Sequence, residues 1–196
     1  MWKIGLTGSI ATGKSTVLRA FADLGVPVFS SDEAVHSLYE GEAVPVVEAL
    51  FPRVTHSGRV DRQKLSAALM AAPARLSELE AAIHPLVRGK IAEFLAAEEQ
   101  KGSAIVVVDV PLLFEGGFDY GFDRIAVTLV DEEEQRRRAL ARPGMSVEKL
   151  ATILARQMPQ AEKRKRADYV FDTSGPLTQT RGAVTALVAA LRATPK

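Results

Sequence analysis

Short runs of β-branched and aliphatic residues alternate along the chain with longer stretches of helical spacing. This alternation predicts an α/β fold, in which a parallel sheet is connected by helical crossovers. We expect five strands, over Trp2–Thr7, Val26–Ser30, Ala104–Val110, Ile125–Val130 and Tyr169–Asp172. Helices are expected over Lys14–Leu24, Asp32–Tyr39, Pro45–Leu50, Arg62–Ala71, Pro73–Glu99, Glu132–Ala141, Ser146–Gln157, Gln160–Ala167 and Leu177–Arg192.

The segment 31–101 breaks this alternation, because it contains helical patterns and no convincing strand. We interpret it as a helical insert within a single domain that spans residues 1–196. A second local feature, 132–146, joins an arginine-rich helix to the break Arg142–Ser146, where Pro and Gly interrupt the pattern. We expect this segment to form a mobile lid.

Composition removes several classes of protein from consideration. Hydrophobic residues make up 47% and charged residues 25% of the 196 positions, which is ordinary for a globular chain. The net charge of +1 gives no overall attraction to nucleic acid or membranes, so we expect neither as a partner. The absence of cysteine excludes disulfides, thiolate zinc sites and thiol catalysis. The apolar runs, such as Ala104–Val108, are too short to span a membrane, and a cytoplasmic protein is expected.

The most specific motif follows the first predicted strand and leads into the first predicted helix. It matches G-x-x-x-x-G-K-[ST] in full and reads Gly8-Ser9-Ile10-Ala11-Thr12-Gly13-Lys14-Ser15, followed by Thr16. Its glycines allow successive backbone N–H groups to face phosphate oxygens at the start of a helix. Lys14 is expected to reach the β- and γ-phosphates, and Ser15 to ligate Mg²⁺. We therefore predict a P-loop NTPase fold in which all nine of these residues bind nucleotide.

A phosphate-binding loop alone does not name a reaction, because motor ATPases, GTPases and small-molecule kinases share it. The chain has neither the N-K-x-D nor the D-x-x-G motif of GTPases, and it is short for a motor ATPase. The helical insert and the arginine-rich segment favour a kinase of a small acceptor.

Two acids follow predicted strands at the sheet edge where ligands of α/β proteins bind. Asp32 is a candidate for accepting a proton from an acceptor hydroxyl or for a place near Mg²⁺, although an Asp there equally suits a helix cap. Asp109 ends the aliphatic run Ile105–Val108 and is expected to act on Mg²⁺ or on Ser15. The alternative for Asp109 is an acid satisfied by nearby backbone.

Arginines provide the second group of candidates. Arg138 and Arg142 share one helical face, which suits a lid that stabilises charge on a transferring phosphate. The alternative is a solvated basic helix paired by Glu132–Glu134. The basic run Lys163–Arg166 is interpreted as solvated surface. His84 is either structural or close to a substrate site, and Glu115 is a weaker candidate that equally suits a loop acid.

Beyond these motifs, the sequence resembles the dephospho-coenzyme A kinase family over nearly the whole chain. The phosphate loop is like the family's LTGGIGSGKSTV, and Asp32 matches the family acid. The other matching segments are Leu24-Gly25, Val60-Asp61-Arg62 with Leu65, Ile83-His84-Pro85-Leu86-Val87, Val110-Pro111-Leu112-Leu113-Phe114-Glu115, Gln135 with Arg138 and Arg142, Arg156-Gln157, and Ala167-Asp168-Tyr169.

The resemblance implies ATP-dependent phosphorylation of the ribose 3′-hydroxyl of dephospho-CoA, with Mg²⁺, in the last step of coenzyme A synthesis. It implies that Asp32 is the base, Arg138 lies near the transferred phosphate, and Arg142 lies near the adenine of ATP. By the same resemblance the insert binds CoA. The implied roles are catalytic for Asp32, Lys14 and Arg138, substrate-binding for Asp32, His84, Pro85, Leu112 and Glu115, and metal-binding for Ser15, Asp32 and Asp109.

Two positions depart from the family pattern. The family often reads D-A-D where this chain has Ser30-Ser31-Asp32, which leaves Asp32 as the sole acid there. The family also often has asparagine where Thr173 stands.

The rival predictions are a kinase of another small acceptor, such as a nucleoside monophosphate or shikimate, and a nucleotide-binding or RNA-binding module that uses Lys163–Arg166. A monomer or weak homo-oligomer is expected.

Overall fold

The computed structural model describes residues 1–194 and 196 and divides the chain into two compact units. The first unit combines residues 1–29 with residues 97–196, and the second consists of residues 30–96. The second unit therefore interrupts the first in sequence, close to the limits of the predicted insert.

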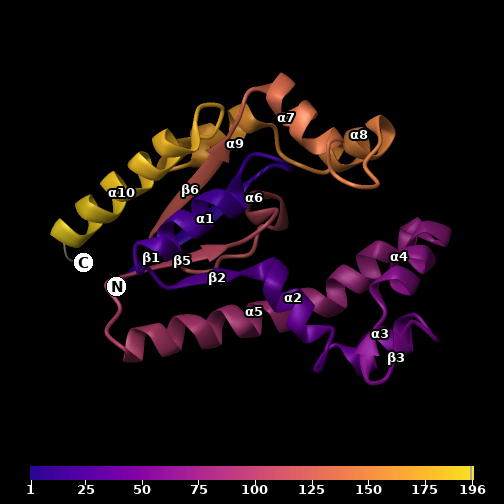
Figure 1. The fold of residues 1–196 in the computed structure, drawn as a ribbon. Coiled ribbons are helices and arrows are strands. Elements are labelled where there is room, and N and C mark those ends of the chain that lie inside the picture. The colour runs from indigo at the N-terminus through magenta and orange to yellow at the C-terminus, as the bar shows by residue number, and fades with distance from the viewer. Residues whose placement is uncertain (195) are drawn as a thin grey trace. The chain divides into compact units, whose positions relative to one another are not determined.

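A five-stranded parallel sheet forms the centre of the first unit, with the strand order β2-β5-β1-β6-β7 (Figure 1). The predicted strands are all present. They are β1 (Trp2–Gly8), β2 (Val28–Ser30), β5 (Ile105–Asp109), β6 (Arg124–Leu129) and β7 (Tyr169–Asp172). Because β1 lies between β5 and β6, the loop that leaves its carboxyl end lies in the middle of the sheet edge.

Two helices cover one face of this sheet. Helices α1 (Lys14–Asp23) and α10 (Leu177–Ala193) pack beside each other and bury a core with the strands. The fully buried members of this core include Ile4 and Leu6 of β1, Val17 and Phe21 of α1, and Val184 of α10. Alternate strand residues thus face the helices, as the pleat of a strand requires.

Shorter helices follow the strands of the first unit. They are α6 (Leu113–Gly116), α7 (Glu132–Leu140), α8 (Val147–Ala155) and α9 (Gln160–Arg166). The predicted lid, 132–146, thus contains α7 and the turn before α8. Ser146 caps α8, since its hydroxyl accepts a hydrogen bond from the Lys149 N–H.

The second unit contains α2 (Ser31–Leu38), α3 (Val44–Leu50), α4 (Arg62–Ala71), the 3₁₀ turn η1 (Pro73–Arg75) and most of α5 (Leu76–Gln100). The expectation that no strand occurs here was wrong, because β3 (Thr55–His56) pairs antiparallel with β4 (Arg59–Val60). The connecting residues Ser57 and Gly58 both have positive φ, which matches the twist of a two-residue hairpin. Strands of two residues leave no periodic pattern in a sequence.

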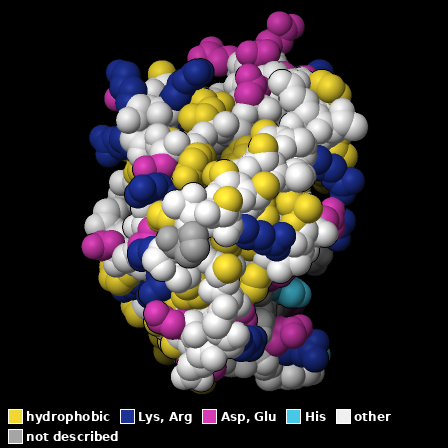
Figure 2. Space-filling model, turned by 90° about the vertical axis from the view of Figure 1, so that its left-hand side faces the viewer, with side chains coloured by type: hydrophobic (Ala, Val, Ile, Leu, Met, Phe, Trp, Pro, Cys, Tyr) yellow, Lys and Arg dark blue, Asp and Glu magenta, His cyan; other side chains and the backbone are white. Residues whose placement is uncertain are grey.

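The distribution of charged side chains on the surface is consistent with the small net charge of the chain. Figure 2 shows basic and acidic side chains mixed over one face of the molecule, with apolar side chains between them. Among the described residues, no helix combines the length and the apolar character of a membrane-crossing segment.

Candidate active site

The phosphate-loop motif forms the connection between β1 and α1, as its sequence predicts. Gly13 is the N-cap of α1 and has φ +79°, and Ala11 has φ +61°. The first helical hydrogen bond is donated by the Thr16 N–H to the Gly13 carbonyl at 3.0 Å. The N–H groups of Lys14 and Ser15 precede it and belong to the unpaired first turn of a helix. This turn presents donors and a partial positive charge to an anion.

Close packing explains both motif glycines. A Cβ at Gly8 would lie 2.7 Å from Thr12 Oγ1 and even closer to Thr128 Oγ1. Those two hydroxyls are hydrogen bonded to each other at 2.7 Å, so a side chain at Gly8 would separate them. A Cβ at Gly13 would lie 3.0 Å from Thr173 Oγ1. The loop therefore depends on hydroxyls contributed by β6 and by the segment after β7.

Lys14 and Asp109 form an ion pair, in which the lysine Nζ contacts Asp109 Oδ1. Asp109 is buried with 3% exposure at the end of β5, next to β1 in the sheet. The fold thus brings these two candidates together, in a pairing that was not predicted from the sequence. The ion pair holds the Lys14 ammonium group against the end of β5, beside the phosphate loop.

Thr173 joins the phosphate loop to the arginine-bearing helix. Its hydroxyl lies 3.0 Å from the Thr12 carbonyl and 3.2 Å from the Leu129 carbonyl, and it accepts a hydrogen bond from Arg138 Nη1 at 3.1 Å. Arg138 Nη2 also donates to the Thr173 carbonyl at 2.8 Å. In the sequence Thr173 stands out only as a departure from a family pattern, which predicts no function for it.

The arginines of α7 are arranged around Glu134. Arg138 Nε donates to Glu134 Oε1 at 2.7 Å, and Arg137 binds both carboxylate oxygens. Hydrogen bonds from Arg137 and then from Arg138 lower the pKa of Glu134 to about 2. The glutamate pairing that was the alternative for these arginines thus occurs at both Arg137 and Arg138, through Glu134. Arg142 follows α7 and is exposed.

Glu115 and Lys163 form a buried pair that the sequence did not predict. Lys163 has 0% exposure, so its interpretation as solvated surface was wrong. Its Nζ lies 2.9 Å from Glu115 Oε1, which also accepts the Met158 N–H at 2.7 Å. Burial by itself raises the pKa of Glu115, but the Lys163 ammonium group and the Met158 N–H outweigh it and hold the pKa below its ordinary value. These contacts favour a positioning role over the predicted substrate contact.

Four other candidates lie outside the phosphate loop. Asp32 is exposed in the first turn of α2, and the cap of this helix is Ser30, whose hydroxyl accepts the Glu33 N–H at 3.3 Å. The capping alternative for Asp32 is therefore wrong. His84 and Pro85 are exposed on α5, in the second unit. In the first unit, Leu112 is the N-cap of α6 and has φ +55°, an uncommon backbone conformation for a leucine.

The oxygen donors beside the loop fit Mg²⁺ delivered with a nucleotide. Ser15 offers an exposed hydroxyl and Asp109 a carboxylate, the hard oxygen ligands that Mg²⁺ prefers. Among the described residues, no three or more His, Cys, Asp or Glu side chains are grouped so that they would hold a metal alone. Kinase sites commonly use one or two protein ligands, with phosphates and water completing the coordination.

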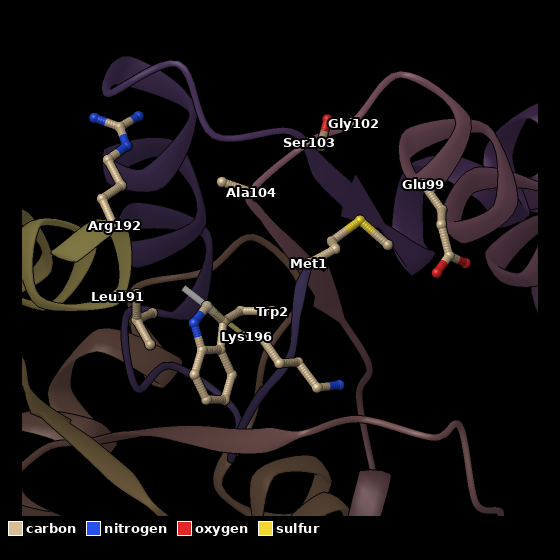
Figure 3. Close-up of a pocket in the computed structure, with 9 residues that line it drawn as sticks. All are labelled: Met1, Trp2, Glu99, Gly102, Ser103, Ala104, Leu191, Arg192 and Lys196. Atoms are coloured by element: carbon tan, nitrogen blue, oxygen red, sulfur yellow. The ribbon is translucent and has the colours of Figure 1, made fainter. Parts of the chain in front are cut away.

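A cavity of about 260 Å³ lies at the opposite edge of the sheet, where β1 begins (Figure 3). The Trp2 indole N–H donates to the Thr194 carbonyl at 2.9 Å beside it. Its position at the amino ends of the strands separates it from the phosphate loop. It is lined by Met1, Trp2, Glu99, Gly102, Ser103, Ala104, Leu191, Arg192 and Lys196.

A parallel sheet whose central strand leads through a glycine-rich loop into a helix, with Lys14 paired to an acid of the adjacent strand, defines a P-loop protein. The model of the dephospho-CoA kinase family matches residues 2–179. A protein of Rhizobium meliloti (strain 1021) named dephospho-CoA kinase is 53% identical over 190 residues, which are 97% of this chain and 98% of the relative.

Solved structures agree with this relationship. A crystal structure of a Thermus thermophilus protein has a TM-score of 0.79 and 36% identity, with 97% of each chain covered. Dephospho-CoA kinase from Campylobacter jejuni has a TM-score of 0.68 over 96% of each chain and, at 24% identity, supports the fold alone. The chain belongs to the dephospho-CoA kinase family.

Proposed function

We propose that this protein transfers the γ-phosphoryl group of ATP to the ribose 3′-hydroxyl of dephospho-CoA, which gives CoA and ADP. The observation that carries the proposal is a complete phosphate loop between β1 and α1 in a chain that matches the dephospho-CoA kinase family over residues 2–179. In the reaction the hydroxyl oxygen forms a bond to the γ-phosphorus. The bond from this phosphorus to the bridging oxygen of ADP breaks.

The phosphate loop binds and orients the donor. The N–H groups of Gly13, Lys14 and Ser15 lie at the start of α1, where they suit the β- and γ-phosphate oxygens. Lys14 supplies a positive charge that Asp109 keeps in place. When Mg²⁺ is bound it neutralises phosphate charge, and Ser15 and Asp109 are the residues that would hold it.

Asp32 is proposed as the group that orients the acceptor hydroxyl and accepts its proton. Its carboxylate is exposed and the helix is capped by Ser30, so the side chain is available for substrate. Ser30 stands where the family often has a further acid, and it caps α2 instead. In this chain the first turn of α2 therefore offers Asp32 and Glu33 as its acids.

Arginines of the lid segment are proposed to meet the charge of the moving phosphoryl group. Arg138 is fixed by Glu134 and Thr173, which keeps its guanidinium beside the phosphate loop. Arg142 is proposed to contact the adenine of ATP. Closure of the turn that follows α7 would exclude water from the reaction.

We assign acceptor binding to the second unit, residues 30–96, with His84 and Pro85 as contacts, and Leu112 as a contact from the first unit. Support comes from the family match and from the exposure of the two α5 residues. A cytoplasmic location, the absence of nucleic-acid partners and a monomeric or weakly associated state stay predictions.

The test is ADP release in the presence of ATP, Mg²⁺ and dephospho-CoA, with controls that omit each component in turn. We expect turnover only when all three are present, and a product that gains one phosphate at the ribose 3′ position by mass spectrometry and ³¹P NMR. Shikimate and nucleoside monophosphates serve as alternative acceptors. Turnover with one of them but not with dephospho-CoA would contradict the assignment.

The role of Asp32 is tested with Asp32→Asn, which keeps the size of the side chain and removes the base. We expect kcat to fall about 10²–10⁴-fold, the usual contribution of a positioned base, while ADP binding is retained. Glu33→Gln is the matched control, because Glu33 is exposed in the same helical turn. A kcat for Asp32→Asn within threefold of the control would remove Asp32 from the chemistry.

A further inference from the structure

Both polar groups of Ile10, in the middle of the phosphate loop, are bound by glutamine side chains. The Ile10 N–H donates to Gln157 Oε1 at 2.9 Å, and the Ile10 carbonyl accepts from Gln135 Nε2 at 2.8 Å. Gln135 belongs to α7, and Gln157 follows α8. Two segments far from the loop in sequence thus bind one of its residues from both sides. The N–H of Ile10, which the motif suggested for nucleotide binding, is engaged by the protein itself.

The roles of the two amides are opposite, and each is fixed by its partners. Only an oxygen can accept the Ile10 N–H, so Gln157 must present Oε1. Gln135 Oε1 accepts from Gln160 Nε2 at 3.0 Å, which leaves its Nε2 facing the Ile10 carbonyl. Gln160 is in turn held at the end of β6 by the N–H and the carbonyl of Val130.

The position of Gln157 is fixed by the buried pair described above. Its neighbour Met158 donates its N–H to Glu115 Oε1, which also contacts Lys163. The fully buried Lys163 therefore anchors the segment that carries Gln157. Anchoring of this segment explains the buried Glu115–Lys163 pair, and the explanation requires no contact between the pair and a substrate.

Apolar contacts follow the same path as the hydrogen bonds. Ala11, which has 7% exposure, packs in a small core with Ala139 of α7 and Leu150 of α8, and Ile10 packs against this core. The predicted lid is thus attached to the phosphate loop through side chains as well as through the two amides.

We propose that Gln135 and Gln157 are positioning residues that clamp Ile10 and hold the phosphate loop in its nucleotide-binding conformation. Neither residue needs to touch the substrate in this role. A loop with Ala11 at φ +61° is strained and persists only when its surroundings hold it. If the clamp is released, the binding-competent conformation becomes a fraction of the population, and the apparent affinity for nucleotide falls by that fraction.

The opposite polarity of the two contacts provides the test. Gln→Glu replaces the side-chain NH₂ by oxygen, so it keeps the acceptor that Gln157 supplies and removes the donor that Gln135 supplies. The proteins to compare are Gln157→Glu, Gln157→Met, which removes the acceptor, and Gln135→Glu. Gln100→Met is the control, because Gln100 is an exposed glutamine at the end of α5.

Binding of ADP with Mg²⁺ is measured by calorimetry well below the unfolding temperature. We expect Gln157→Met and Gln135→Glu to weaken ADP binding about 5- to 30-fold, the loss expected for one buried peptide group left unpaired. Gln157→Glu is expected to bind at least threefold more tightly than Gln135→Glu. Both substitutions add one negative charge beside the same residue, so charge alone predicts equal losses, and equal losses would overturn the proposal.

Hydrogen exchange of the nucleotide-free proteins separates a local effect from general destabilisation. The Ile10 amide should exchange at least tenfold faster in Gln157→Met than in wild type, and near the wild-type rate in Gln157→Glu. ADP affinity of Gln157→Met within twofold of Gln100→Met, or unchanged exchange at Ile10, would also overturn the proposal. Although the inference rests on nucleotide use by this site, it involves no acceptor, so failure of the dephospho-CoA assay would leave its test intact.

Discussion

Gly13 combines two constraints that no other residue type meets. Its φ of +79° disfavours any side chain, and a Cβ would lie 3.0 Å from Thr173 Oγ1, the hydroxyl that contacts Arg138 and the Thr12 carbonyl. Gly13→Ala should therefore destabilise the protein by about 2–4 kcal/mol, from backbone strain together with overpacking. It should also weaken ADP binding more than tenfold, which chemical denaturation and calorimetry would measure.

Gly25→Ala isolates the backbone contribution to this prediction. Gly25 has a similar φ of +71°, but nothing lies within 4 Å of its Cβ position. Its alanine variant should lose at most about 1 kcal/mol, because strain is offset by a less flexible unfolded chain. It should bind ADP normally. Similar losses in the two variants would show that Thr173 does not restrict Gly13.

Part of the candidate site could be predicted from the sequence, namely the residues that belong to one short motif. The phosphate-loop spacing located Lys14 and its helix, because the chemistry of anion binding requires that pattern within eight consecutive residues. The role of Thr173 was not predicted, because a threonine after a short strand has no distinctive sequence signal. Its role arises from Arg138 and Thr12, which are distant in sequence and meet it only in the fold.

At the scale of elements, α9 depends on the pair that Lys163 forms with Glu115 of α6. Glu115→Gln leaves the Lys163 charge buried and unpaired and should destabilise the protein by about 2–4 kcal/mol. Lys163→Met should cost less, because Glu115 is 16% exposed and keeps the Met158 N–H. The double variant should be less destabilised than the sum, by at least about 1 kcal/mol. Urea denaturation of the four proteins at pH 7 measures this coupling, and additive losses would contradict it.

The same coupling should depend on pH in a defined direction. The pKa of Glu115 is held below its ordinary value by Lys163 and Met158 against the opposing effect of burial. A lowered pKa in the folded state stabilises the protein above the unfolded value of about 4.5 and stops doing so as pH falls through the folded value. The Glu115–Lys163 coupling should therefore shrink below pH 4.5. The exposed pair of Lys165 with Glu162 on the same helix is the control, and its coupling should be smaller at every pH.

Elements were predictable where their pattern was long. The buried run Ile105–Asp109 and the amphipathic α10 follow from hydrophobic spacing over five or more residues. The hairpin of β3 and β4 has two residues in each strand and depends on the turn at Ser57–Gly58. A run of four charges at Lys163–Arg166 ordinarily indicates solvated surface. Its first member is buried because an acid from α6, 48 positions earlier, offers it a partner.

At the scale of the whole molecule, the two units correspond to two different proposed functions, nucleotide binding and acceptor binding. The phosphate loop and its supporting contacts all belong to the first unit, residues 1–29 and 97–196. The proposed acceptor contacts on α5 and the proposed base at Asp32 belong to the second unit, residues 30–96. A ligand that binds only the folded state stabilises the region that it contacts. Amide hydrogens in that region then exchange more slowly.

Hydrogen exchange with each ligand alone should therefore give two different patterns. ADP with Mg²⁺ should protect peptides from residues 6–20 and 130–175, where the loop, its glutamine clamp and Thr173 lie. Dephospho-CoA should protect peptides from residues 30–96. Shikimate, a small acceptor without an adenine or a pantetheine arm, is the control and should protect neither region. Protection by dephospho-CoA confined to the first unit would contradict the acceptor assignment, because the insert would then have no part in holding the substrate whose hydroxyl Asp32 is proposed to deprotonate.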